Sequence, residues 1–251
     1  MSRFLNIFNQ KFYLIVIISV LSLFIISIGF LYYRHSAGTI RNEKQNDLKA
    51  IAELKANEIM QWQKERMADA RVMTGRPFFI ERVKTWLFSD SPDAQLKQMI
   101  LTDLRTLQKA YRYESIILAS VNGIPVLSSG YELDRLDSLT VDKVRELALR
   151  DTLIKPDFYY CELEQKIHFD VLAPLVDQSG HAIAVLVMRM DPQDYLYPLI
   201  QSWPTPSKTS ETLIVRQDGG HVLFLNELRH RKHTAMKFRI PLTQTNVPAV
   251  Q

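Results

Sequence analysis

Residues 12–33 read FYLIVIISVLSLFIISIGFLYY and contain no charged side chain. Lys11 precedes this run and Arg34 follows it. A helix of about twenty residues, with a rise of about 1.5 Å per residue, crosses a hydrocarbon core of roughly 30 Å. The run therefore predicts a transmembrane helix over residues 12–33, with Tyr32 and Tyr33 at the membrane interface.

A cleavable signal peptide is the alternative interpretation of the same run. The apolar region of a signal peptide usually spans only about 7–15 residues and ends in small residues of the A-x-A type. This run is longer and ends in aromatic residues, so we expect an anchor that is retained. Lys and Arg flank both of its ends, and counting them does not decide which end is cytoplasmic.

The composition places the folded part of the chain after the anchor. The chain has 251 residues, 47% of them hydrophobic, and the part beyond Arg34 is long enough for one or two ordinary domains. The 31 Lys and Arg residues barely outnumber the 27 Asp and Glu residues, and their scattering indicates a solvated surface and no nucleic-acid binding. The single cysteine, Cys161, excludes an intramolecular disulfide. We expect it to be a small strand residue rather than a nucleophile.

A long helix is expected directly after the anchor. Residues 39–74 contain neither proline nor glycine and are rich in strong helix formers. They predict an amphipathic stalk over residues 36–74, which ends at the Gly-Arg-Pro sequence of residues 75–77. The stalk either packs on its own domain or pairs with a second copy in a homodimer. The stripe expected to make these contacts consists of Leu48, Ala52, Ala56, Ile59, Gln63, Met67 and Ala70.

The period of the apolar residues changes after the stalk. Helical patterns cover residues 78–88, 93–110 and 141–150, and strand-like patterns cover residues 115–121, 124–129, 157–162, 166–176 and 181–190. Asn122-Gly123 is a two-residue hairpin signal between the first two strands. Five antiparallel strands interrupted by helices predict a small α+β domain.

The C-terminal part repeats the opening of this domain. Residues 118–127 and 214–223 share the order strand, Asn/Asp-Gly turn and strand ending in Val-Leu. The likeness is either chance or the start of a second module on the same plan. A rigid, proline-containing connector over residues 202–210 separates the two parts, and a further strand is expected over residues 236–242. Residues 211–251 are too few for a module of the first one's size, so we expect a partial module.

This order of elements resembles the double Cache, or PAS-like, extracytoplasmic sensor region of bacterial membrane receptors. The C-terminal sequence resembles that of sensors joined to PAS, histidine-kinase or diguanylate-cyclase output domains. The segments that carry this resemblance are WPTP at residues 203–206, LFLNELRH at 223–230 and IPLT at 240–243. The resemblance implies an inner-membrane protein that senses a small molecule without a cofactor. It would pass a ligand-dependent helix shift to a cytoplasmic output domain that this chain lacks.

The resemblance also implies a domain plan and a ligand class to test. Residues 1–11 would be a short cytoplasmic tail, residues 75–201 a membrane-distal module in the periplasm, and residues 211–251 part of a membrane-proximal module. This chain departs from the family by lacking the rest of that module and the returning membrane helix. Amino-acid-binding members carry an Arg-x-Trp-Tyr segment, which is not found here, so the motif does not support an amino-acid ligand.

Alternation on the strand over residues 166–176 selects the candidate ligand contacts. Ile167, Phe169 and Val171 share one face, and His168 and Asp170 share the other. The second face either borders a ligand pocket or is solvated. Asp191, at a strand end before a proline, either contacts a ligand or caps the following helix. The full set of candidate ligand-binding residues is Tyr131, Tyr159, His168, Asp170, Arg189 and Asp191.

Other functions have weaker support in the sequence. His230 and His233 have a spacing seen in metal sites, but the intervening Arg231 and Lys232 would repel a cation, so no metal site is expected. The sequence has no phosphate-binding glycine loop, nucleophile elbow or His-Glu-x-x-His motif. A tethered hydrolase using Asp170 and His168 is thus disfavoured, and a tethered adaptor that binds a partner protein is the main alternative to a sensor.

Overall fold

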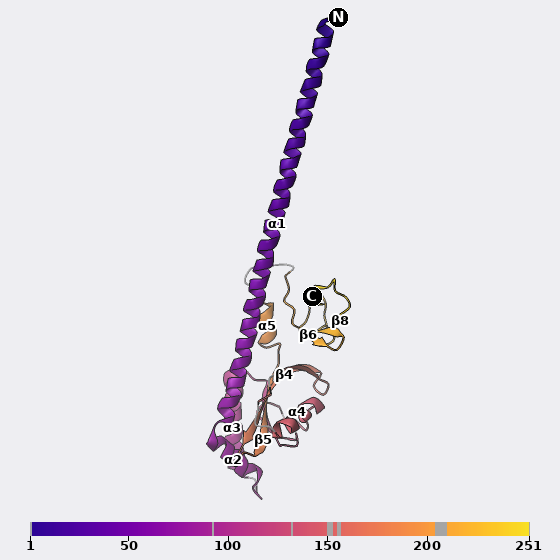
Figure 1. The fold of residues 1–251 in the computed structure, drawn as a ribbon. Helices are drawn as coiled ribbons and strands as arrows, with labels where there is room; N and C mark the ends of the chain where they lie inside the picture. Colours follow the sequence, from indigo (N-terminus) through magenta and orange to yellow (C-terminus); the bar gives the residue numbers. More distant parts are fainter. Residues whose placement is uncertain are drawn as a thin grey trace. The chain divides into compact units, whose positions relative to one another are not determined.

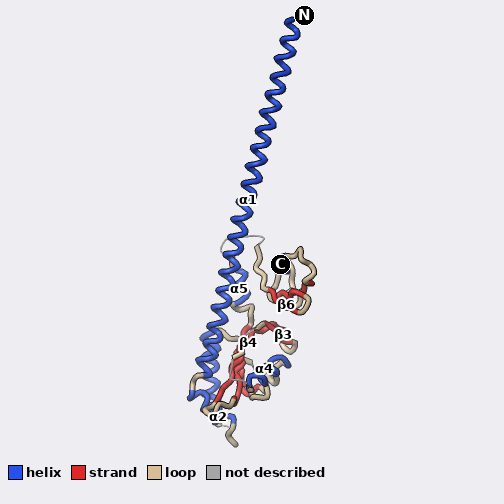
Figure 2. The backbone as a smooth tube through the Cα atoms, in the orientation of Figure 1, coloured by secondary structure: helices blue, strands red, loops and turns tan. Residues whose placement is uncertain are grey.

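The computed structural model describes residues 2–91, 93–131, 133–149, 153–154, 157–203 and 210–250. The chain divides into two compact units, Met1–Leu54 and Lys55–Gln251, and each is described by itself. Figures 1 and 2 show the order of the helices and strands along the chain. Residues 204–209 of the predicted connector lie outside the described residues.

The first unit is the N-terminal part of helix α1 (Ser2–Thr74). From Val16 onward this helix is long and apolar enough to cross a membrane. Its large apolar side chains between Val16 and Tyr33 are exposed. Because a helix that is apolar on all sides needs an apolar environment, this segment has the properties of a membrane span.

The second unit contains the end of α1 and further helices. Gly75 ends α1, where its N–H donates to the carbonyl of Arg71 at 2.8 Å, and Pro77 occupies the first turn of the next helix, where no N–H is needed. Asp93 caps the third helix by accepting a hydrogen bond from the N–H of Gln95 at 2.7 Å. The helices after α1 are α2 (Pro77–Leu87), α3 (Ala94–Tyr111), α4 (Ser138–Ala148) and α5 (Leu196–Gln201).

The packed face of α1 differs in part from the predicted stripe. Ile59, Met67 and Ala70 lie on this face, as predicted, whereas Ala56 of the stripe is exposed. The stripe omitted Lys55, Trp62 and Met73, which are all buried. Lys55 and Trp62 are buried against Leu199 and Phe169, partners that the periodicity of a helix does not record. Within the second unit one face of the helix therefore packs on its own domain.

Lys55 has a complete set of hydrogen-bond acceptors around its buried ammonium group. Nζ donates to the carbonyl of Leu199 at 2.9 Å, to Oγ of Ser202 at 3.0 Å and to Oε2 of Glu58 at 2.9 Å. These three acceptors match the three donors of a lysine. The contacts join the α1 segment of this unit to the end of α5.

A five-stranded antiparallel sheet forms the centre of the second unit. Its spatial order is β2-β1-β5-β4-β3, and β5 pairs with β1 and β4 through Val187, which faces Ile117 on one side and Leu172 on the other. The predicted α+β class with a five-stranded antiparallel sheet is confirmed. The strands are β1 (Ser115–Ala119), β2 (Pro125–Ser128), β3 (Phe158–Cys161), β4 (Lys166–Val176) and β5 (Ala182–Met190).

The two faces of this sheet carry different layers. One face packs against helices α1, α2 and α3 through residues such as Phe169 and Leu186. The other face packs against α4, where Leu172 and Val187 meet Val144. Figure 1 shows α4 and the α2–α3 pair on opposite sides of the sheet. The alternation predicted along β4 therefore separates two layers, and the α4 layer holds the polar residues described below.

Asp177 closes the turn between β4 and β5. Its Oδ1 accepts hydrogen bonds from the N–H groups of Ser179 at 2.9 Å and His181 at 3.1 Å, and its Oδ2 accepts one from Nζ of Lys84 at 2.8 Å. Lys84, followed by the N–H of His181, holds the pKa of Asp177 at about 2, below its ordinary value.

A lowered pKa makes the contribution of Asp177 depend on pH. The contribution is fully present above the pKa of the unfolded chain, about 4, and is lost as the pH falls through the folded pKa of about 2. We therefore expect Asp177→Asn to lower the melting temperature at pH 7 and to have a much smaller effect near pH 2. Melting curves between these pH values test this, and Lys84→Met should reduce the same difference. An effect of Asp177→Asn that is as large at pH 2 as at pH 7 would contradict the linkage.

The loop between β1 and β2 is longer than the two-residue turn predicted from Asn122-Gly123. Ala119 pairs with Pro125, and the N–H of Gly123 donates to the carbonyl of Ser120 at 2.9 Å. Gly123 has a φ of +84°, and a Cβ there would lie 2.9 Å from Cγ1 of Val141. The glycine is therefore required by both its backbone conformation and the approach of α4.

Because two separate constraints act at Gly123, an alanine should lower the stability more at this position than at a glycine with only one of them. Gly180 has a φ of +80° but has open space around it, so Gly180→Ala should cost only the left-handed backbone strain of about 1–2 kcal/mol. Gly123→Ala should cost more, because its Cβ also displaces Val141. Chemical denaturation of both variants measures the difference. Equal losses would show that Val141 moves aside without cost.

A second, smaller sheet contains β6 (Val215–Asp218), β7 (His221–Phe224) and β8 (Arg239–Pro241) in that order, all antiparallel. The predicted strand over residues 236–242 is wrong at its start. Met236 has a φ of 59°, and the N–H groups of Lys237 and Phe238 bond back to the carbonyl of Thr234. A turn therefore occupies the first residues of that stretch. A short 3-10 helix (Pro248–Val250) follows.

Candidate functional site

A group of polar side chains lies on the α4 side of the five-stranded sheet. Tyr159 on β3 faces His168 on β4, and Asp170 on β4 faces Arg189 on β5. Because side chains alternate along strands, this register places all four on one face. We call the following residues the polar cluster: Glu114, Tyr131, Asp137, Tyr159, Glu164, His168, Asp170 and Arg189.

Arg189 is the centre of the polar cluster and is only 1% exposed. Its Nη2 donates to the hydroxyl of Tyr159 at 2.9 Å and to Oδ2 of Asp170 at 3.3 Å. Its Nη1 donates to Oε1 of Glu164. The Tyr159 hydroxyl in turn donates to Oδ2 of Asp170 at 2.6 Å. The guanidinium is thus held in one orientation by partners on two strands and a hairpin turn.

Helix α4 begins at this cluster. Asp137 caps the helix, with Oδ1 accepting from the N–H of Thr140 at 3.0 Å. Its Oδ2 lies 3.8 Å from Nη2 of Arg189, and Oγ1 of Thr140 lies 3.2 Å from the hydroxyl of Tyr159. The first turn of α4 therefore contacts both the cation and the phenol of the cluster.

His168 is fully buried between two carboxylates. Its Nδ1 lies 3.3 Å from Oε2 of Glu114, and its Nε2 lies 3.3 Å from Oε2 of Glu164. Neither contact has hydrogen-bond geometry, so both ring nitrogens lack a hydrogen-bond partner among the described residues. Lys166 donates to Oε1 of Glu114 at 3.0 Å. The contact with His168, together with Lys166, outweighs burial and lowers the pKa of Glu114 to about 2.

The charge states of the cluster follow from burial and pairing. Burial acts to lower the pKa of Arg189, but Asp170 and the surrounding oxygens more than offset it, and the pKa is raised. Burial, followed by the charge of Asp170, raises the pKa of Tyr159. Arg189 is therefore a permanent cation and Tyr159 a permanent hydrogen-bond donor. Oδ1 of Asp170 is buried without a partner in the described part of the chain, so it can accept a hydrogen bond from a bound molecule.

The structure brings five of the six candidate residues into this cluster. Tyr131 lies at its rim, 37% exposed, where its hydroxyl donates to Glu164. Asp191 lies apart: its Oδ1 accepts from the N–H of Gln193 at 2.8 Å, which caps the turn after β5. Helix α5 has Tyr195 as its N-cap, so Asp191 caps that turn and not the helix.

Sequence reasoning missed several members of the cluster. Glu114 precedes β1, Asp137 precedes α4 and Glu164 lies in the β3–β4 turn, and none of these positions follows a strand alternation. The one local signal was Asp137, whose side chain three residues before Thr140 is typical of a helix cap. The other two reach the cluster only through the folding of the sheet.

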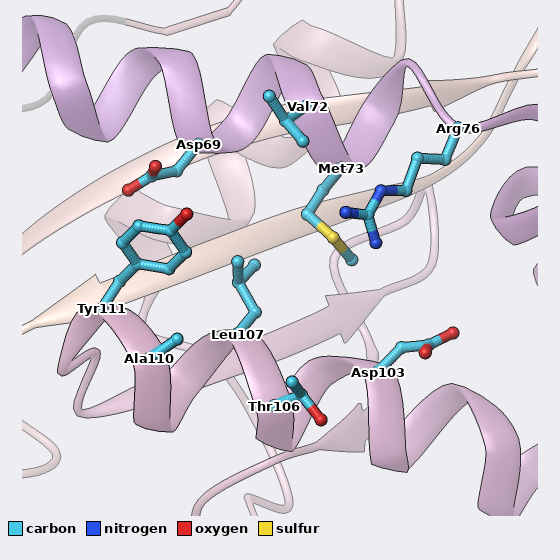
Figure 3. Close-up of a pocket in the computed structure, with 9 residues that line it drawn as sticks. All are labelled: Asp69, Val72, Met73, Arg76, Asp103, Thr106, Leu107, Ala110 and Tyr111. Carbon is cyan, nitrogen blue, oxygen red and sulfur yellow. The ribbon is translucent and has the colours of Figure 1, made fainter.

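The opposite face of the sheet has surface hollows of a different kind. Figure 3 shows one of about 180 Å³ between α1 and α3, which is lined by Asp103 of α3 and by Arg76, the residue before α2, and in which Asp69 approaches Tyr111. Ligand sites for small molecules are usually about 300–1,000 Å³. This groove is smaller and, since it lies between two packed helices, we assign it to helix packing.

Comparison with known proteins gives matches in structure. No protein-family model matches the sequence, and no curated protein matches it. The ligand-binding domain of the Pseudomonas fluorescens chemoreceptor CtaA, in complex with L-serine, is 15% identical, with a TM-score of 0.51 over 78% of this chain and 77% of that chain. The ligand-binding domain of the Campylobacter jejuni chemoreceptor Tlp3, in complex with 4-methylisoleucine, is 14% identical, with a TM-score of 0.50 over 61% of this chain and 60% of that chain.

These similarities show the fold. The chain has the architecture of chemoreceptor ligand-binding domains, and the resemblance to a double Cache sensor region is confirmed at the level of the fold. The chain spans about 60% of the length of the Tlp3 domain.

Proposed function

We propose that this chain is the extracytoplasmic sensor region of a bacterial membrane receptor, and that a small molecule binds at the polar cluster. The observation that carries the proposal is the buried pair of Arg189 and Asp170, in which Oδ1 of Asp170 has no partner. A buried charged pair with an unused acceptor is costly for a purely structural element. The shared fold with two chemoreceptor domains that bind amino acids supports the same function.

The chemistry of the cluster selects a ligand that carries a protonated amine. Asp170 offers an anionic acceptor, and carboxylates of Glu164 and Asp137 lie around the same cation. An ammonium group donates hydrogen bonds and balances this negative charge, whereas a simple carboxylic acid would be repelled. Tyr131 at the rim is placed to contact the remainder of the ligand.

The apolar helix supports a membrane location for the protein and a path for its signal. The N-terminal segment would be cytoplasmic, α1 would cross the inner membrane, and the second unit would lie in the periplasm. Binding would shift α1 by a small distance in a homodimer formed through residues 36–74, and an output domain beyond this chain would read that shift. No enzymatic step is part of this function.

A thermal-shift measurement on the full chain in detergent tests ligand binding. L-Serine and 4-methylisoleucine, each compared with its deaminated analogue, are the first probes. A ligand that binds only the native state adds about 2.7 kcal/mol of stability at one hundred times its Kd, so the melting temperature should rise with the amine and not with the analogue.

Two variants make this test specific. Asp170→Asn should weaken binding of the amine about 10- to 100-fold, because the charged acceptor is lost. Asp218→Asn on the second sheet removes an exposed carboxylate paired with Arg239 and should leave binding unchanged. If no small molecule stabilises the chain and a partner protein is captured with high affinity, the adaptor function replaces the sensor.

A further inference from the structure

The hairpin between β3 and β4 gathers three side chains that commonly bind metal ions. Cys161, Glu164 and His168 each present one ligand atom, and these atoms all lie within 4.8 Å of one another. Cys161 is 1% exposed and His168 is fully buried. The turn between them is short, and Cys161 pairs with Lys166, so the β3–β4 register itself sets their approach. No ion is needed to bring them together.

The surroundings of the sulfur do not by themselves favour a thiolate. Burial raises the pKa of the Cys161 thiol, although the backbone N–H groups of Glu164 and Leu163 act in the opposite direction. A thiol that coordinates a divalent metal ion is deprotonated by the metal itself, so the geometry of the ligand atoms is what supports the site.

His168 supplies a second, independent observation. Both of its ring nitrogens are buried and lack a hydrogen-bond partner among the described residues. Nε2 lies 3.3 Å from Oε2 of Glu164, and Nδ1 lies 3.3 Å from Oε2 of Glu114. Metal-binding histidines generally direct one nitrogen at the metal and the other at a carboxylate, which sets the tautomer and the ring orientation. Glu114 occupies the place of that carboxylate.

We propose that Cys161, Glu164 and His168 form a site for a divalent transition-metal ion, with Zn²⁺ as the best match. Sulfur, imidazole nitrogen and carboxylate oxygen are the usual ligands of Zn²⁺, and three protein ligands leave a fourth position open. With bond lengths of about 2.0–2.3 Å, tetrahedral ligand atoms lie about 3.3–3.8 Å apart. Loading the site therefore needs a contraction of about 1 Å at its longest edge, which a side-chain rotation supplies.

The charge of the polar cluster favours a cation at this position. The carboxylates of Glu114, Asp137, Glu164 and Asp170 face the cations Arg189 and Lys166. This excess of negative charge in a buried region is costly unless a further cation is present.

Cobalt binding to the full chain in detergent, after removal of metal with a chelator, tests the site. We expect a one-to-one complex with a thiolate-to-cobalt charge-transfer band and the visible bands of tetrahedral coordination, and Zn²⁺ should bleach both. The probe is the metal alone, so the result does not depend on the proposed amine ligand. The absence of a charge-transfer band on addition of cobalt would overturn the site.

Matched variants assign the ligands. Cys161→Ala and Cys161→Ser should both abolish the charge-transfer band while leaving the melting temperature of the metal-free chain close to that of the wild type. Glu114→Gln should weaken binding about 10- to 100-fold, as expected for a residue that orients a ligand. The loop variant H230N/H233N removes two other histidines and should change nothing. A band that survives in Cys161→Ala, or disappears in H230N/H233N, would contradict the assignment.

Discussion

Arg189→Met is expected to lower the free energy of unfolding by about 3–5 kcal/mol, because it leaves the carboxylates of Asp170 and Glu164 buried without their cation. Methionine keeps most of the side-chain volume, so the loss reports charge and hydrogen bonding rather than a cavity. The measurement is chemical denaturation of the full chain in detergent at neutral pH, followed by near-UV circular dichroism.

An exposed arginine provides the control for this variant. Arg216 pairs with Asp157 at 2.6 Å, but the two side chains are 35% and 54% exposed. Arg216→Met should therefore cost no more than about 1 kcal/mol. Similar small losses in both variants would mean that water enters the polar cluster and solvates Asp170, which would also remove the basis for a dry ligand site.

Phe169→Ala is expected to cost about 3–5 kcal/mol of stability. Phe169 is 1% exposed, and its ring centroid lies 4.9 Å from that of Trp62 and 5.1 Å from that of Phe158. The alanine leaves a cavity between β4 and the α1 segment of the second unit. It should also shift the fluorescence of Trp62 toward that of a solvated indole before global unfolding.

Phe78→Ala is the control for this variant, because it makes the same substitution at an exposed position. Its side chain is 87% exposed at the start of α2, so Phe78→Ala should change the stability by no more than about 0.5 kcal/mol. If Phe169→Ala lowers stability without changing the fluorescence of Trp62, the aromatic contact contributes to the sheet alone and does not fix α1.

The periodic parts of this fold were predictable from the sequence. The length of the uncharged apolar run identified the apolar helix, and the absence of Gly and Pro after it identified the continuation of that helix. The alternation of apolar and polar residues identified the strands. On β4, alternation also separated Phe169 from His168 and Asp170, which the structure places in two different layers. These predictions depend on local geometry alone, and local geometry is what a sequence pattern records.

The structural features that the sequence did not predict depend on tertiary contacts. Trp62 and Lys55 belong to the buried face of α1 because β4 and α5 supply their partners, which no helical pattern records. Met236 adopts a left-handed conformation that the apolar pattern of a strand does not reveal. Glu114 and Glu164 join the candidate site across the sheet, and such contacts are absent from any single stretch of the chain.

The ammonium group of Lys55 has a topological consequence. It hydrogen-bonds to Leu199 and Ser202, so the two ends of the segment that contains the five-stranded sheet, Lys55 and Ser202, are in contact. Adjacent termini are the arrangement that allows a domain to be inserted into a loop of a host protein, or to be circularly permuted. The segment from Lys55 to Ser202 has this arrangement.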